Sequence, residues 1–599
     1  MAHQDLIRRA EAAGISASYL DWRKKRVQVP PETLTALIDA IGSPGGDPPQ
    51  ACEGTGMLPR LPRSRSFGLT VQLYSVRSRQ SWGHGDLADL ADLAAWSARE
   101  LGAGFIVINP LHAGEPATPL SDSPYLPMTR RYVSPLYLRI EDIPEFARLD
   151  PESRRRIEQL AGPLRAASRT ADLIDRDRVW AAKRQALELI HGVARTSERE
   201  RTYRAYAERE GAELATWATW CALAEQHGAD WRLWPAGLRD PGQAVPPGTS
   251  AGLTRRAEFH AWLQWLLDEQ RASAQARALA AGMTFGVIGD LAVGAHPGGA
   301  DAWAHQALIV PGVTVGAPPD GFNQRGQDWA QPPWHPHRLA EAGGRPLADL
   351  FAAALRHSGG LRVDHVMGLM RLWWIPAGMP PAAGAYVRYD HRMMVGAMTA
   401  EAARAGAVAI GEDLGTVDQW IRRYLASQHV LGTSMLWFAR QRDGSPLPPE
   451  QWRRACMATV GTHDVPPVTG FVTGDQVAAR ARLGLLADPA AEGEAAKLAL
   501  SRWTDMLVAQ GLLATDREPS PDLYTVALYG FLARTRALLV GVSLADAVGD
   551  RRTQNVPGTA TEYPNWRVPL CAAEGNAVLL DDLPSVGLLR EVVRAVSAA

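Results

Sequence analysis

Residues 67–76 read FGLTVQLYSV, an apolar run typical of a buried strand. A helical pattern follows around residues 86–101, where apolar side chains recur on one side. A second apolar run, GFIVINPL, comes at residues 104–111. Strand, helix and strand in this order form the repeating unit of a parallel β-sheet. This stretch therefore predicts a protein of the α/β class.

The same alternation resumes after residue 283. Helical patterns separate most of the later apolar runs, for example at 346–357, 391–405 and 417–427. With the first two strands the runs make eight, and a closed (β/α)8 TIM-like barrel is the natural architecture for them. The later runs are TFGVIGDLAV (284–293), GLRVDHV (360–366), AVAIGEDL (407–414), TSMLWF (433–438), ATVGTHDV (458–465) and ALLVGVSL (537–544).

The pattern divides the chain into four parts. Residues 1–65 are expected to form a small helical N-terminal unit followed by a linker rich in glycine and proline. Residues 66–144 form the first part of the barrel. Residues 145–282 are mostly helical and too long for a simple crossover, so we interpret them as an inserted helical subdomain. Residues 283–599 complete the barrel.

The composition excludes several classes of function. The chain has 599 residues, a formal net charge of −1 and no long run of one charge, which argues against binding nucleic acid or membrane surfaces by bulk charge. No apolar stretch reaches the about 18 residues of a membrane span, and the N-terminus lacks the core of a signal peptide. The four cysteines are scattered, as is typical of free thiols in a reducing compartment. We therefore expect a cytoplasmic protein.

Sequence motifs for common cofactors are missing. The chain has no Walker-type phosphate-binding loop, no GxGxxG after a strand and no HExxH. The cysteines show no spacing typical of metal ligands. We therefore expect no cofactor and no required metal ion.

Acidic side chains stand at the ends of several predicted strands. In a TIM barrel these ends meet at one mouth, where the active site is built. One acidic residue there is explained equally well as a helix cap, but four strands that share the feature indicate a common site. His365 and His463 flank two of these positions. The acidic strand ends are Asp290, Asp364, the pair Glu412 and Asp413, and Asp464.

Crowded carboxylates have two main uses, and the strand ends alone do not choose between them. They bind divalent metal ions. They also cleave glycosidic bonds, where one carboxylate attacks the anomeric carbon and a protonated partner serves the leaving oxygen. A retaining reaction needs the two groups about 5–5.5 Å apart, which neighbouring barrel strands supply. Crowding also raises the pKa of the acid partner, which keeps it protonated near neutral pH.

Three motifs at the acidic strand ends resemble those of the 4-α-glucanotransferases (amylomaltases or disproportionating enzymes) of glycoside hydrolase family 77, in the α-amylase clan. They read LRVDHVMGL at 361–369, AIGEDLGTV at 409–417 and GTHDVPP at 461–467. The similarity runs from about residue 67 to about residue 570. Four further segments are similar to segments of this family: WGHGDL (82–87), SDSPYLPMTRRYVSPLY (121–137), VGAPPDGFNQRGQDWAQPPW (315–334) and NVPGTATEYPNW (555–566).

The resemblance implies a retaining 4-α-glucanotransferase. Such an enzyme transfers α-1,4-glucan segments from a donor maltooligosaccharide to the 4-OH of glucose or another glucan through a covalent glycosyl-enzyme. An α-1,4-glucan hydrolase of the same clan is the alternative. A barrel that binds glucan or metal without catalysis is disfavoured by the intact acidic trio. The implied partners are maltooligosaccharides and other α-1,4-glucans, with glucose as acceptor and neither nucleic acid nor membrane; the oligomeric state stays open.

The resemblance also assigns roles to residues. Asp364 is the nucleophile, Glu412 the general acid and then base, and Asp464 the carboxylate that stabilises the transition state. Arg362 lies on the same strand as Asp364 and on the same side, so its positive charge favours an ionised nucleophile. Asp413 is expected to be structural. The substrate-binding candidates are Arg362, His365, His463, Asp290, Tyr125, Asn555 and, from a lid loop near 315–334, Asp320, Gln327 and Trp329.

Overall fold

The computed structural model describes residues 2–42, 58–242, 251–320, 323–415, 417–514 and 519–598. Eight parallel strands close into a barrel and follow one another around it in chain order. The predicted (β/α)8 architecture is confirmed, and each of the eight predicted strands overlaps one barrel strand. They are β3 (Ser66–Val71), β4 (Phe105–Ile108), β7 (Gly286–Leu291), β10 (Gly360–Val363), β13 (Val408–Gly411), β14 (Leu431–Met435), β15 (Cys456–Thr459) and β16 (Leu539–Ser543).

Alternating side chains fill the interior of the barrel. On β4, Phe105 and Val107 join a buried cluster made by the barrel strands, whereas Ile106 joins the core under the helices. Successive residues of a strand face opposite sides, so one short apolar strand serves both layers. Gly68 on β3 lies so close to its neighbour that a Cβ would stand 2.3 Å from the backbone oxygen of Phe105. The interior therefore requires glycine at this position.

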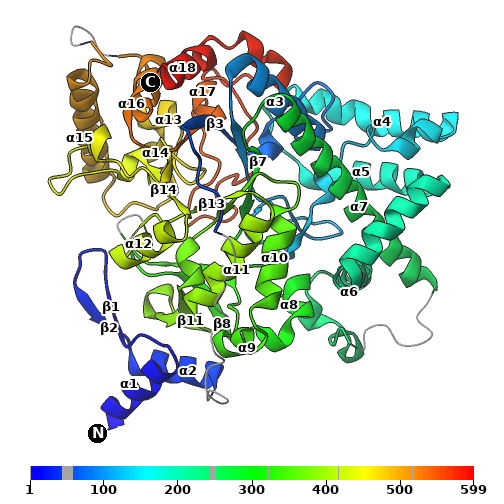
Figure 1. Cartoon of the computed structure of the whole chain (residues 1–599), viewed down its shortest axis with the longest axis horizontal. Helices are drawn as coiled ribbons and strands as arrows, with labels where there is room; N and C mark the ends of the chain where they lie inside the picture. The colour runs from blue at the N-terminus through cyan, green and yellow to red at the C-terminus, as the bar shows by residue number, and fades with distance from the viewer. Residues whose placement is uncertain are drawn as a thin grey trace.

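Most of the chain between β4 and β7 is helical and covers one side of the barrel (Figure 1). The last of these helices, α7 (Ala251–Ala280), packs along α6 (Ser197–His227), against β7 and against α3 (Leu87–Trp96). It thereby joins the helical segment to the barrel. The longest of these helices, α6, bends at Gly211, where φ is 59°. The four long helices are α4 (Pro151–Ser168), α5 (Arg176–His191), α6 (Ser197–His227) and α7 (Ala251–Ala280).

The predicted helical N-terminal unit contains two helices and also a hairpin that the sequence pattern did not reveal. The helices are α1 (Ala2–Ala12) and α2 (Pro31–Ile41). Between them, β1 (Ser18–Leu20) and β2 (Arg26–Gln28) pair antiparallel. Strands this short carry almost no alternation, which is why the unit reads as purely helical. Residues 43–57 of the predicted linker lie outside the described residues.

The segment predicted as a lid loop forms a β-hairpin. Its strands β8 (Val313–Ala317) and β9 (Gln327–Gln331) pair antiparallel and belong to a second, four-stranded sheet. The other strands of this sheet are β11 (Arg371–Pro376) and β12 (Ala385–Arg388). Pro318, Pro319 and Gly326 read as loop and lie in the connection between the two strands, whereas Gly316 belongs to β8 and Pro332 and Pro333 follow β9. Residues 321 and 322 lie outside the described part.

One predicted strand was placed too far along the chain. The run 458–465 was expected to end its strand at the acidic residue, yet β15 ends at Thr459. Residues 463 and 464 form a turn. The helices predicted at 346–357, 391–405 and 417–427 match α10 (Arg345–Leu355), α11 (His391–Arg404) and α12 (Gln419–Ser427).

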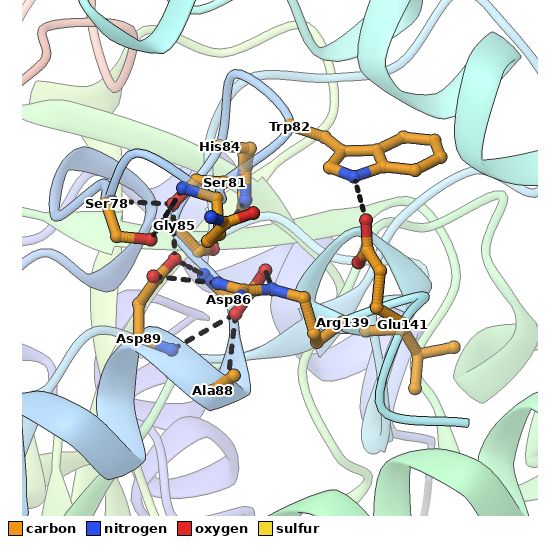
Figure 2. Close-up of polar contacts among 12 residues, drawn as sticks. Ser78, Ser81, Trp82, His84, Gly85, Asp86, Ala88, Asp89, Arg139 and Glu141 are labelled. Carbon is orange, nitrogen blue, oxygen red and sulfur yellow. Dashed lines mark hydrogen bonds and ion pairs between the residues drawn. The ribbon is translucent and has the colours of Figure 1, made fainter. Parts of the chain in front are cut away.

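A buried ion-pair network fixes the first strand-to-helix connection (Figure 2). Asp86 caps α3 and accepts hydrogen bonds from the backbone N–H groups of Ala88 and Asp89. The guanidinium of Arg139 donates through Nε to Asp86 at 2.6 Å and through Nη2 to Asp89 at 2.8 Å. Burial, and then the charge of Asp86, raise the pKa of Asp89 to about 7 although Arg139 opposes the shift. Arg139 therefore compensates two carboxylates that water does not reach.

The WGHGDL motif at 82–87 supplies part of this network. Trp82 is buried and donates from Nε1 to the Glu141 carboxylate at 2.9 Å, while Ser81 donates from Oγ to Asp89 at 2.7 Å. Figure 2 shows that these contacts join the start of α3 to the segment around Arg139. The motif therefore fixes the connection from β3 to α3 against the segment of Arg139 and Glu141.

None of the helices in the described part of the chain combines the length and the apolar surface that a bilayer span requires.

We predict that Arg139→Met lowers the free energy of unfolding by about 3–5 kcal/mol, because it leaves two buried carboxylates without their cation. The Arg139 side chain is only 9% exposed. Urea denaturation at about pH 7.5 measures the loss of unfolding free energy.

The matched control is Arg79→Met. Arg79 also pairs with two aspartates, Asp581 and Asp582, but its side chain is 46% exposed. Its loss is expected to cost far less than the loss of Arg139, because water and salt screen an exposed ion pair. Equal losses in the two variants would show that burial of the Arg139 network contributes nothing.

Candidate active site

Three neighbouring strands bring the first acidic residues together. Asp364 directly follows β10 and Glu412 directly follows β13. These strands pair in parallel with Val363 beside Gly411, so the two carboxylate residues are adjacent in the register. On the other side of β10, Arg362 lies beside Asp290 of β7. The register alone therefore gathers these side chains at one mouth of the barrel.

Arg362 joins the carboxylates of β7 and β10. Its Nη1 donates to both oxygens of Asp290, each at 2.7 Å, and its Nη2 donates to Oδ1 of Asp364 at 2.9 Å. Both Arg362 and Asp290 are buried, whereas Asp364 is partly exposed. Burial disfavours the charged guanidinium, but the charges of Asp290 and Asp364 outweigh this and raise the pKa of Arg362. The side chain is thus a permanent cation that orients Asp364.

Glu412 is held by backbone donors and retains a proton near neutral pH. Its two carboxyl oxygens accept from the N–H groups of His365 at 3.0 Å and Leu414 at 2.6 Å. Burial, and then the charge of Asp364, raise the pKa of Glu412 to about 7, while Arg362 opposes the shift. A carboxyl group with this pKa serves as acid and as base at neutral pH.

The backbone of His365 is strained to make this contact. Its φ of 43° and ψ of 59° lie in the left-handed region, which side chains other than glycine seldom adopt. This conformation turns the N–H of His365 toward the carboxyl group of Glu412. Burial lowers the pKa of the His365 imidazole to about 4, so the ring is neutral.

The third carboxylate, Asp464, lies in the turn after β15. Its side chain is 45% exposed, and Oδ1 accepts from Nδ2 of Asn555 at 2.6 Å. Nε2 of His463 lies 3.3 Å from Oδ2. Burial disfavours the charged form of His463, but the negative charge of Asp464 outweighs this and raises the pKa of the imidazole. The pair therefore presents a carboxylate fixed by two donors.

Tyr125 links the two halves of the site. Its Oη donates to Oδ2 of Asp290 at 2.7 Å and lies 3.3 Å from Nδ1 of His463. A continuous series of contacts thus runs from Asp364 through Arg362 and Asp290 to Tyr125 and His463. Burial, and then the charge of Asp290, raise the pKa of Tyr125 well above its usual value, so its hydroxyl stays a donor.

The lid hairpin contributes an aromatic ring to the same place. The Trp329 ring meets the His365 ring edge-on, with centroids 5.2 Å apart. Gln327 lies beside it and accepts from Nε1 of Trp329 at 3.3 Å. Asp320 lies at the connection between β8 and β9, where its carboxylate accepts from the N–H of Asn323 at 2.6 Å. Of the three lid candidates, Trp329 contacts His365 beside the carboxylates, Gln327 contacts Trp329, and Asp320 contacts the connection between the two hairpin strands.

Two residues of the site were missed by sequence reasoning. The buried Trp566 ring packs against the rings of Tyr125 and His463, each at 5.2 Å between centroids. Gln331 donates from Nε2 to the backbone oxygen of Tyr125 at 2.8 Å. Both residues lie in segments that resemble the family, Trp566 at the end of NVPGTATEYPNW and Gln331 within 315–334, and these segments were the available signal.

Asp413 is structural, as expected. It is buried and accepts from Nη1 and Nη2 of Arg453 at 2.5 and 2.6 Å and from the N–H of Thr433 at 2.9 Å. These partners lie on β14 and just before β15, away from Asp364. Among the described residues, no group of three or more His, Cys, Asp or Glu side chains is placed to hold a metal ion.

The comparisons with known proteins agree with this geometry. Residues 71–573 match a family model described as 4-alpha-glucanotransferase. The 4-alpha-glucanotransferase of Mycobacterium tuberculosis is 53% identical over 561 residues, which cover 91% of this chain and 77% of the relative. The enzyme of the same name from Haemophilus influenzae is 35% identical over 538 residues, covering 85% and 76%.

Two solved structures are similar. The amylomaltase from Corynebacterium glutamicum superposes with a TM-score of 0.90 at 36% identity and covers 99% of each chain. The amylomaltase from Streptococcus agalactiae in complex with acarbose gives a TM-score of 0.70 at 17% identity, covering 89% of this chain and 99% of that one. The second comparison supports the fold alone.

We predict unequal stability effects for two adjacent substitutions measured by thermal unfolding above the pKa of Glu412. Asp413→Asn breaks charged hydrogen bonds to Arg453 and is expected to cost about 1.5–3 kcal/mol. Glu412→Gln is expected to cost less, because the amide removes a buried charge, although its NH2 group faces one of the two backbone N–H donors.

The smaller cost of Glu412→Gln follows from the raised pKa of Glu412, about 7 against 4.5. The stability that this group contributes is present at low pH and is lost as the pH rises through about 7. Glutamine cannot ionise, so it removes that loss. A large destabilisation by Glu412→Gln would contradict the burial of an acid in this position.

Proposed function

This chain belongs to the 4-alpha-glucanotransferases of glycoside hydrolase family 77, and we propose that Asp364, Glu412 and Asp464 perform its chemistry. The enzyme transfers segments of α-1,4-glucan, and the family assignment does not favour the alternative of a hydrolase. The observation that carries the proposal is the pairing of an Asp364 bound by Arg362 with a Glu412 whose pKa is about 7.

In the first half of the proposed reaction, Asp364 attacks the anomeric carbon of the donor glucan. The bond from this carbon to the leaving oxygen breaks, and Glu412 gives that oxygen its proton. A covalent glycosyl-enzyme ester and a free sugar result. Arg362 supports this step because its cation compensates the carboxylate of Asp364 until the ester forms.

In the second half, the now ionised Glu412 takes the proton from the 4-OH of an acceptor sugar. The acceptor oxygen attacks the anomeric carbon, the ester bond breaks, and Asp364 is released as a carboxylate. The configuration at the anomeric carbon is retained because it is inverted twice. Glucose and the 4-OH end of another glucan both carry the hydroxyl group that this step needs.

Asp464 supports the transition state between these steps. Its negative charge faces a sugar ring that becomes positively charged as the glycosidic bond breaks. His463 and Asn555 hold the carboxylate in place, and Trp566 fixes the ring of His463. Trp329 and Tyr125 are proposed to contact the sugar, Trp329 from the lid hairpin and Tyr125 from its place beside Asp290 and His463.

Transfer rather than hydrolysis requires that an acceptor sugar outcompetes water for the glycosyl-enzyme. The contact between Trp329 and His365 places an apolar surface beside the strand end of Asp364. Such a surface excludes water and lets a bound sugar hydroxyl react in its place. We also propose a cytoplasmic site of action, which the free thiols of Cys221, Cys456 and Cys571 support.

We predict that maltotriose is converted to glucose and a ladder of longer maltodextrins, and that labelled glucose enters the ladder as acceptor. Asp364→Asn is expected to lower turnover by several orders of magnitude, as when a covalent nucleophile is lost. Chromatography of the products measures both. Asp581→Asn, a change at a surface ion pair, is the matched control and is expected to retain the ladder. Exclusive formation of shorter sugars would contradict transfer.

We predict that kcat/KM falls as the pH rises through about 7. Glu412 has a raised pKa of about 7, so its proton is present below this pH and is lost above it. Without the proton the leaving oxygen departs unassisted, and the rate is expected to fall about tenfold for each further pH unit. Initial rates with maltotriose measure the profile. A rate that stays constant to pH 9 or beyond would assign the acid role to another group.

A further inference from the structure

A rigid hairpin in the N-terminal unit presents an exposed tryptophan. The turn between β1 and β2 is closed by Asp21, whose Oδ1 accepts from the N–H groups of Arg23 at 2.9 Å and Lys25 at 2.8 Å. The N–H of Asp21 also donates to the backbone oxygen of Lys25 at 2.9 Å. At this turn the Trp22 side chain is 43% exposed, and the guanidinium of Arg23 lies 4.6 Å from its ring centroid. The ring is therefore held in place and open to solvent.

The base of the hairpin is fixed to the second sheet. The N–H of Ser16 donates to the backbone oxygen of Tyr386 at 2.8 Å, and the N–H of Arg388 donates to that of Gly14 at 3.0 Å. The Tyr19 ring on β1 stands edge-on to the rings of Trp373, at 4.8 Å, and Tyr386, at 6.3 Å. These contacts set the position of Trp22 relative to β11 and β12.

The second sheet is also joined to the loops that follow Asp364 and Glu412. Arg371 begins β11 shortly after Asp364 in the chain, and Asp418 caps α12 shortly after Glu412. Nη1 of Arg371 pairs with Oδ2 of Asp418 at 3.3 Å, so this ion pair joins the two loops that carry the reacting groups. The guanidinium of Arg371 also lies 4.3 Å from the centroid of the Tyr386 ring.

A series of aromatic rings thus leads away from the active site. It begins at the Arg371–Asp418 ion pair, passes Tyr386 and Tyr19, which are partly exposed, and ends at Trp22. Figure 1 shows the hairpin of β1 and β2 rising from α1 and α2 on the side of the molecule that carries β11 and α12. Flat aromatic faces with polar groups at their rims suit the apolar faces of sugar rings, and an exposed aromatic patch indicates a binding surface.

We propose that Tyr386, Tyr19 and Trp22 form a distal binding site for the part of a long α-1,4-glucan that extends beyond the catalytic carboxylates. The proposal rests on the proposed function, because the occupant is the substrate of that reaction. Continuity with the loops of Asp364 and Glu412 favours the glucan over other ligands. The site selects for chain length, since a short donor ends before it reaches Trp22.

The test compares long and short donors. Values of kcat/KM are measured with maltotriose and with a fractionated long-chain amylose, for the parent and for Trp22→Ala. The ratio of long to short is expected to fall about threefold to tenfold in Trp22→Ala, as for an exposed aromatic ring buried by its ligand. Trp22→Phe is expected to retain most of the ratio because it keeps an aromatic face. Leu233→Ala, which truncates an exposed apolar side chain elsewhere, is the matched control.

Direct binding gives a second measurement without turnover. Affinity electrophoresis in a gel containing soluble amylose compares Asp364→Asn with the double variant Asp364→Asn, Trp22→Ala. The double variant is expected to migrate faster because it binds the glucan less tightly. An unchanged ratio together with unchanged migration would overturn the distal site.

The outcomes separate this proposal from the catalytic one. If the parent enzyme forms no ladder from maltotriose, the proposed function fails. If it forms the ladder but Trp22→Ala changes neither the ratio nor the migration, only the distal site fails. The basic residues Arg23, Lys24 and Lys25 also allow an anionic partner. A Trp22→Ala variant that loses retention on a heparin column while keeping the glucan ratio would assign the hairpin to such a partner and overturn the proposal.

Discussion

The guanidinium of Arg362, bound between Asp290 and Asp364, is the interaction on which the rest of the site depends. The closed barrel dictates it, because the parallel register of β7 and β10 places Asp290 beside Arg362. Two buried charges of opposite sign compensate each other at a place where either one alone would be costly. The other terminal nitrogen of the guanidinium holds Asp364, the proposed nucleophile, which is partly exposed.

The neighbouring residues Glu412 and Asp413 show how environment decides the role of a carboxyl group. They leave the same strand on opposite sides, as successive residues do. Asp413 meets the guanidinium of Arg453 and becomes a fixed structural charge. Glu412 meets backbone N–H groups and the negative field of Asp364, so its pKa rises to about 7. The role of each carboxyl group therefore depends on the direction in which it leaves the end of β13, toward Asp364 or toward Arg453.

The sequence reveals those features that are local in the chain. Eight apolar runs and the acidic residues at their ends predict the barrel and the carboxylates, because alternation and strand ends are short-range patterns. Features that arise from distant partners stay hidden. Trp566 acquires its role only by packing against Tyr125 and His463, and Arg139 only by meeting Asp86 and Asp89. The hairpins of β1–β2 and β8–β9 were missed because their strands are short and rely on a second sheet for support.

The second sheet gives the barrel an aromatic surface beside the mouth, which we propose favours sugar over water. Its hairpin β8–β9 brings Trp329 to His365, and β11 and β12 carry Tyr386 and support Tyr19. A glucan held along such a surface is present at the glycosyl-enzyme at high effective concentration, whereas water must diffuse in. Because the reacting groups of a glucanotransferase would serve a hydrolase equally well, the difference between the two activities has to arise from this surrounding surface. The sheet is anchored to the barrel through Arg371 and Asp418, so the surface that selects the acceptor and the loops that carry the reacting carboxyl groups are joined at one ion pair.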